Sequence, residues 1–273
     1  MEQCRPTSSR ALGLAIVVAG CIAACNGATR QKTRAVDEEA IRQIAIHYEY
    51  SGWATVNEDF VIQRRPNGEF GMTGNVASGS QPAKAVDVRV RQSDLRRFLR
   101  EIVAPAWSRR QGIEDVAKRV GVRRLLSFEP TSRIPASDCD ESAILTTARS
   151  MVARQGVEGI VDAYYRDGIR WTDDDPFVVV QILFRDAAPI IISSDSQRAL
   201  MLPWRVGVPD RSARTPAQQN WSVPLSRSVQ ALLPPESKLY QRLGGIERMN
   251  AYLRDNLEAT AERSCSAAKA NAQ

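Results

Sequence analysis

The chain has 273 residues, which is long enough for one large domain or two small domains with a hydrophobic core. Hydrophobic residues (43%) and charged residues (25%) occur at the frequencies of a globular protein, and the formal net charge is +6. Histidine is the commonest general base and metal ligand, and the chain contains one, His47, so the composition argues against histidine-based catalysis and against a zinc site.

The first 25 residues have the three parts of an export signal. Arg5 and Arg10 form a positive region, residues 11–24 form an uncharged apolar run, and small residues precede Cys25. The sequence Ile-Ala-Ala-Cys that ends at Cys25 resembles the lipid-attachment box of bacterial lipoproteins. The chain turns polar directly after Cys25, which makes Cys25 the expected attachment site. A second box, Val-Ala-Gly-Cys, makes Cys21 the alternative.

This resemblance implies that the cysteine thiol is diacylated and that the new amino terminus is then acylated. Three acyl chains anchor a protein stably to a membrane. In enteric bacteria an aspartate after the cysteine favours retention in the inner membrane, so Asn26 implies the outer membrane. The apolar run is shorter than the ~20 residues that span a bilayer, which leaves an uncleaved anchor as the weaker alternative. We therefore expect a signal peptide over 1–24 and a lipidated cysteine with its tether over 25–36.

Alternation of apolar residues with period two predicts the first strand. Ile44, Ile46, Tyr48 and Tyr50 alternate with smaller or polar residues, which is typical of a strand with one buried face. In an alternative interpretation the preceding residues 37–40 open a short helix.

A hairpin is predicted next, from strands at 59–64 and 69–73. Its turn, 65–68, contains a proline that presets one dihedral angle and a glycine that accepts a positive φ. After a loop at 75–83, the alternating valines of 86–90 predict a fourth strand.

Helices follow the fourth strand. Apolar residues between 95 and 103 recur at helical spacing with arginines on the opposite face, which predicts a helix that Ser93 and Asp94 cap and Pro105 ends. Further helices are predicted at 113–120, 141–154 and 157–165.

A second block of strands and helices completes the chain. Strands are predicted at 177–184, 189–193 and 200–206, and helices at 225–233 and 246–269, with a polar loop at 205–220. The first of these strands is apolar on both faces, so we expect it near the centre of a sheet. The order of elements predicts an α+β fold of antiparallel strand meanders interleaved with amphipathic helices. We expect one periplasmic domain over 37–273, with a division into β-then-α halves at about 37–155 and 156–273 as the alternative.

Two cysteines lie beyond the signal, Cys139 and Cys265. Export places them in an oxidising compartment, where disulfides persist, and two thiols allow one intramolecular pair. The sequence therefore predicts a disulfide between them, with two separate buried thiols as the alternative.

Motifs for catalysis, metals and cofactors are weak. The acidic run 173–175 lacks the spaced ligands of a calcium loop, and Ser266–Lys269 fits S-x-x-K without the partner motifs of penicillin-binding enzymes. No glycine-rich nucleotide motif follows a predicted strand. We therefore expect no metal, no cofactor and no catalytic residue of a recognisable type.

Residues 84–124 are unusually basic, with twelve basic and five acidic side chains. Such a patch indicates an anionic partner, such as lipid head groups, lipopolysaccharide or an acidic protein, and a solvated surface is the alternative. A periplasmic location argues against nucleic acid. The candidate binding residues are Arg89, Arg91, Arg96, Arg97 and Arg100.

These observations predict a lipid-anchored envelope lipoprotein that faces the periplasm and works by binding, not by catalysis. Three alternatives stay open. One is an enzyme that uses carboxylates on cell-wall or envelope polymers. Another is an inhibitor or immunity lipoprotein that neutralises a periplasmic toxin. The third is a structural or assembly component of the envelope.

Overall fold

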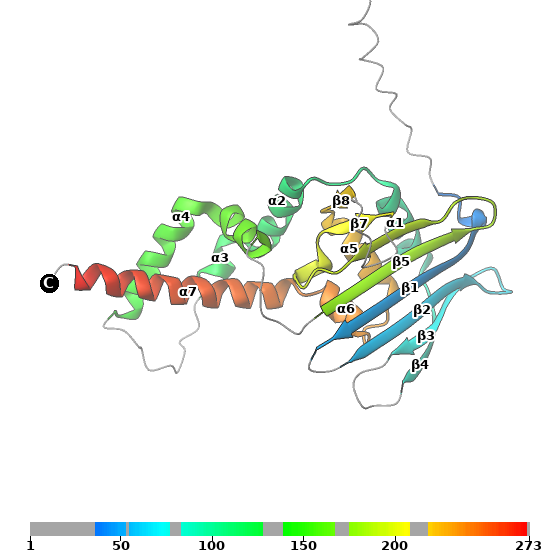
Figure 1. The fold of residues 1–273 in the computed structure, drawn as a ribbon, viewed down its shortest axis with the longest axis horizontal. Helices are drawn as coiled ribbons and strands as arrows, with labels where there is room; N and C mark the ends of the chain where they lie inside the picture. The colour runs from blue at the N-terminus through cyan, green and yellow to red at the C-terminus, as the bar shows by residue number, and fades with distance from the viewer. Residues whose placement is uncertain are drawn as a thin grey trace, which may run out of the picture. The chain divides into compact units, whose positions relative to one another are not determined.

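The computed structural model describes residues 36–52, 55–76, 83–127, 139–166, 175–207 and 218–271. Within these ranges eight antiparallel strands form one sheet in the order β4-β3-β2-β1-β5-β6-β7-β8 (Figure 1). The strands are β1 (Ile41–Ser51), β2 (Val56–Arg64), β3 (Phe70–Val76), β4 (Lys84–Arg89), β5 (Asp175–Phe184), β6 (Ile190–Ser194), β7 (Trp204–Val206) and β8 (Gln218–Asn220).

The sheet has a seam at its centre, where β1 pairs with β5 and Ile46 lies opposite Val180. From this seam β1–β4 run outward as one meander and β5–β8 as another. The central place that apolar patterning predicts for β5 is confirmed, although its second face is only half-buried at Val179 and Leu183.

One face of the sheet supplies much of the hydrophobic core. In β1, Ile44, Ile46 and Tyr48 are buried, whereas the residues between them are partly exposed, as period-two alternation predicts. The predicted hairpin is also present. Gly68 has a φ of +84° in the turn between β2 and β3, and the Arg65 N–H donates to the Glu69 carbonyl at 2.7 Å.

Helices follow each meander. They are α1 (Gln92–Val103), α2 (Arg109–Val120), α3 (Val122–Leu125), α4 (Glu141–Arg166), α5 (Val223–Leu232), α6 (Lys238–Leu243) and α7 (Ile246–Ala270), with short 3-10 helices η1 (Glu38–Ala40) and η2 (Ala199–Met201). Together with the sheet they confirm the predicted α+β fold. The two helices expected on either side of residue 156 form α4, which is interrupted at Gly156 with a φ of +68°.

Each strand meander and the helices after it pack against the other meander and its helices. β1 pairs with β5, α1 contacts α5, and α4 lies along α7 (Figure 1). Helix α5 is buried on most of its surface because it lies among α1, α6 and η2. The Trp204 indole N–H donates to Ser226 Oγ of α5 at 2.8 Å and ties β7 to this helix.

The predicted disulfide between Cys139 and Cys265 is present. Its Cα atoms are 6.3 Å apart, and 126 positions separate the two residues. The bond connects the segment before α4 to the last turns of α7, so the α4–α7 pair is crosslinked at the end that lies away from the sheet (Figure 1).

Local predictions were wrong at three places. The end of the loop expected at 205–220 forms β8, because Gln218–Asn220 pair with β7. Helix α1 begins at Gln92 without a side-chain cap, because Asp94 lies in its first turn and accepts a hydrogen bond from Arg91 Nε at 2.6 Å. The strand expected at 200–206 is shorter, because Leu200 and Met201 have positive φ values and form η2 instead. Positive φ is incompatible with a strand.

Candidate functional site

Three of the five predicted binding arginines are in ion pairs with nearby carboxylates. These pairs are Arg89–Glu69, Arg91–Asp94 and Arg96–Glu38, with N–O distances of 2.6, 2.6 and 2.7 Å. Arg97 and Arg100 are exposed on α1 and make no ion pair within the described ranges. The arginine patch is therefore partly neutralised, and the cations free to meet a partner are fewer than the sequence suggests.

A groove of about 540 Å³ lies where the end of β4 meets α1 and the connection from α5 to α6. It brings together Arg89, Arg91 and Arg97, but Arg96 and Arg100 do not line it. A fourth arginine, Arg227 of α5, comes from the far side of the groove. The charged lining is thus four arginines against two carboxylates, Asp94 and Glu236.

Arg227 was missed from the sequence because it lies more than a hundred residues from the basic segment. A local signal was nevertheless present, since Arg227 is the one charged residue in the otherwise buried helix α5. It is exposed and has no ion pair in the part of the chain that the structure describes. Arg97 and Arg227 are therefore the two groove cations with no carboxylate partner among these residues.

The groove lies at the end of an edge strand, where Val88 and Arg89 of β4 contribute to its lining. β4 is the terminal strand of the sheet and pairs only with β3 among the described residues. One row of its backbone N–H and C=O groups therefore lacks a strand partner, and Val88 beside it is 39% exposed. Such an edge accepts an additional extended segment through main-chain hydrogen bonds. The apolar side of the groove comes from Leu233, Pro234 and Pro235.

Other residues that the sequence singled out have ordinary surroundings. His47 lies on the open face of the sheet with Nδ1 2.7 Å from Asp59 Oδ1, and both side chains are more than a third exposed. The Ser266 hydroxyl donates to the Glu262 carbonyl at 3.1 Å inside α7. No group of three or more His, Cys, Asp or Glu side chains suited to a metal ion occurs in the described ranges.

Cys21 and Cys25 lie outside the described residues, as do Asp173 and Asp174, so the predicted lipid-attachment site stays a prediction. Among the helices of the described ranges, none has the length and apolarity needed to cross a bilayer. No family model, curated protein or solved structure matches this chain.

Proposed function

We propose that this protein is a bacterial envelope lipoprotein that faces the periplasm and binds an extended, acidic segment of a partner protein in the groove beside β4. The observation that carries the proposal is an edge strand beside two arginines, Arg97 and Arg227, that have no carboxylate partner within the described residues. Binding, and not catalysis, is the activity that such a surface supports.

The envelope location rests on two features. The lipid-attachment box at Cys25 directs the chain to a membrane as a lipidated protein. The disulfide between Cys139 and Cys265 supports the same location, because such bonds persist in oxidising compartments. Asn26 favours the outer membrane.

A protein segment suits the groove better than a lipid surface does. An extended chain can form main-chain hydrogen bonds to a strand edge, whereas a lipid head group offers no row of backbone donors and acceptors. Carboxylate side chains of the segment would pair with Arg97 and Arg227 through two parallel hydrogen bonds each. At exposed positions each pair contributes about 0.2–1 kcal/mol, so the two arginines together change affinity by up to about 30-fold.

Fluorescence anisotropy with labelled peptides tests the binding mode. We use the purified full chain with its disulfide intact and a peptide of about six residues, the length of β4, that alternates valine and glutamate. The acidic peptide is expected to bind, with affinity that falls as salt rises, and a peptide of alternating valine and lysine is expected not to bind. Methylation of alternate backbone nitrogens should abolish binding, because it removes the donors that pair with β4.

Charge-reversal variants locate the site. Arg97→Glu with Arg227→Glu should weaken acidic-peptide binding at least about fivefold. The matched control is Arg100→Glu with Arg123→Glu, which makes the same change in net charge at exposed positions that do not line the groove. Equal losses in both double variants, or preferential binding of the protein to anionic vesicles, would contradict the proposal.

Mass spectrometry of the membrane-bound protein tests the anchor. We expect a mature chain that begins at a triacylated Cys25, and the variant Cys25→Ala should leave the membrane fraction. A triacylated Cys21 would transfer the site to the alternative box. An unmodified Met1 on cytosolic material would refute the location.

A further inference from the structure

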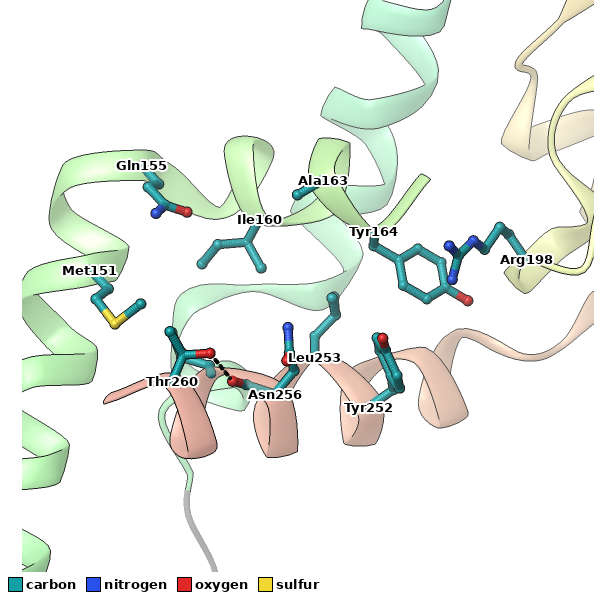
Figure 2. A pocket seen from close by; sticks show the side chains of 11 residues that line it. Met151, Gln155, Ile160, Ala163, Tyr164, Arg198, Tyr252, Leu253, Asn256 and Thr260 are labelled. Carbon is teal, nitrogen blue, oxygen red and sulfur yellow. Dashed lines mark hydrogen bonds between the residues drawn. The ribbon is translucent and has the colours of Figure 1, made fainter. Parts of the chain in front are cut away.

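A second hollow lies between α4 and α7, and it shares no lining residue with the groove beside β4. Figure 2 shows it as a trough between the two helices, with Arg198 at one end beside Tyr164. Its volume is about 180 Å³. Apolar side chains (Met151, Ile160, Leu253, Leu257) and uncharged polar ones (Gln155, Asn256, Thr260) form its walls.

Arg198 is the one charged side chain that lines this pocket. The residue is only 9% exposed, and its guanidinium makes no ion pair within the described ranges. The guanidinium carbon lies 4.7 Å from the centroid of the Tyr164 ring, so its observed partner is an aromatic face. A cation with so little exposed surface favours an anionic partner, and a stacked ring supplies only part of that stabilisation.

The loop that carries Arg198 is held from both sides. The Arg198 backbone N–H donates to Ser196 Oγ at 3.2 Å. The hydroxyls of Tyr164 and Tyr165 both hydrogen-bond to the backbone of Ala199, the residue after Arg198. The Ala199 N–H donates to Tyr164 Oη at 3.1 Å, and the Tyr165 hydroxyl donates to the Ala199 carbonyl at 2.9 Å. Burial raises the pKa of Tyr165 well above 10, so its hydroxyl stays a donor at neutral pH.

The segment immediately after Arg198 is strained. Leu200 and Met201 have φ values of +63° and +51°, which non-glycine residues adopt rarely and at a cost. Buried hydrogen bonds hold the strain in place: Ser226 Oγ donates to the Leu200 carbonyl at 2.8 Å, and Ser194 Oγ donates to the Met201 carbonyl at 2.6 Å. Strain of this kind is concentrated at ligand-binding sites, where it positions a group before the ligand arrives.

We propose that this pocket binds a small organic carboxylate. The carboxylate pairs with the Arg198 guanidinium, and a short apolar body lies between Ile160 of α4 and Leu253 and Leu257 of α7. A volume of about 180 Å³ suits a ligand with a short chain. The proposal does not depend on the function proposed for the groove.

The test follows the methyl group of Met151, which lines the pocket, by NMR of the full chain labelled with carbon-13 at its methionine methyls. The variant Met151→Leu assigns the signal, and the fully buried Met72 of β3 serves as the internal reference. Hexanoate is the probe. We expect a saturable shift of the Met151 signal, with a dissociation constant on the order of millimolar, and no shift of Met72.

Two variants should weaken hexanoate binding on the order of tenfold or more. Arg198→Gln removes the cation. Asn256→Asp adds a negative charge, like that of hexanoate, at the exposed rim of the pocket and leaves Arg198 in place. It therefore tests whether binding depends on the ligand's charge even if the first variant unfolds. The control Arg248→Gln removes an exposed cation of α7 that does not line the pocket, and it should bind as the wild type does.

Three results would overturn the proposal. If hexanol bound with the same affinity as hexanoate, the pocket would be an apolar cavity in which Arg198 does not contribute to binding. Inorganic phosphate competing equally would show an anion site without preference for an organic body. A Met151 signal that hexanoate does not move would exclude the site.

Discussion

Glu58 provides the sharpest test of how the core is held together. Its side chain is fully buried on the core face of β2, where its carboxylate accepts three hydrogen bonds. The donors are the Ser237 hydroxyl at 2.6 Å and the backbone N–H groups of Lys238 and Leu239 at 2.8 and 3.2 Å. Lys238 and Leu239 open α6, and N–H groups in a first helical turn have no acceptor within the helix.

The change Glu58→Ala leaves these three donors without an acceptor. Each unsatisfied buried donor costs about 1–3 kcal/mol, so the free energy of unfolding should fall by roughly 3–9 kcal/mol. That is a large part of the 5–15 kcal/mol typical of a folded domain. Glu58→Gln keeps the shape but turns an NH2 group toward at least one donor, so we expect a loss of about 1.5–3 kcal/mol.

Urea unfolding followed by tryptophan fluorescence measures both losses, with the disulfide kept intact. Glu236→Ala is the matched control, because it removes an exposed glutamate directly before Ser237 and should change stability by less than about 0.5 kcal/mol. A Glu58→Gln protein as stable as the wild type would refute the reasoning, because the carboxylate would then have no special role.

Three other perturbations have defined outcomes. Replacing Cys139 and Cys265 together by serine removes a crosslink between residues 126 positions apart. Chain entropy then predicts that the free energy of unfolding in urea falls by up to about 5 kcal/mol, and a fall below about 1 kcal/mol would contradict this. Gly112→Ala places a Cβ 2.6 Å from the Trp221 Cβ and carbonyl oxygen, so the melting temperature should drop by an amount that corresponds to about 1–3 kcal/mol, and an unchanged value would show that α2 moves freely. Burial raises the pKa of Tyr165 above its unfolded value of 10.0, so its contribution to the free energy of unfolding is complete below pH 10 and is lost as the pH rises through the native pKa. In the variant Tyr165→Phe the free energy of unfolding should therefore fall less steeply above about pH 10. An unchanged slope would mean that another group causes the fall.

Short-range patterns in the sequence were sufficient to predict most elements. Period-two alternation identified β1, the proline and glycine of residues 65–68 identified the hairpin, and helical spacing identified α1 and α7. These features depend on neighbours two to four positions apart, which the sequence displays directly. The disulfide was also predictable, because two cysteines after residue 25 allow a single pair.

The side-chain environments at the candidate sites could not be predicted from the sequence. Arg89 and Arg96 were predicted to bind an anionic partner, but tertiary packing placed Glu69 and Glu38 beside them. The same packing brought Arg227 across the groove from Arg97. Likewise, nothing near Arg198 in the chain signals that it is buried, because Tyr164 and the walls of its pocket come from α4 and α7.

The amino-acid order by itself therefore indicated most of the longer strands and helices, the position of one tight turn, and which thiols pair. Tertiary structure alone decided that β1 meets β5, which arginines form ion pairs, and which arginine is buried with no carboxylate partner among the described residues. The physical reason is range: backbone conformation responds to adjacent side chains, whereas the electrostatic state of a side chain is set by whatever surface the fold presses against it.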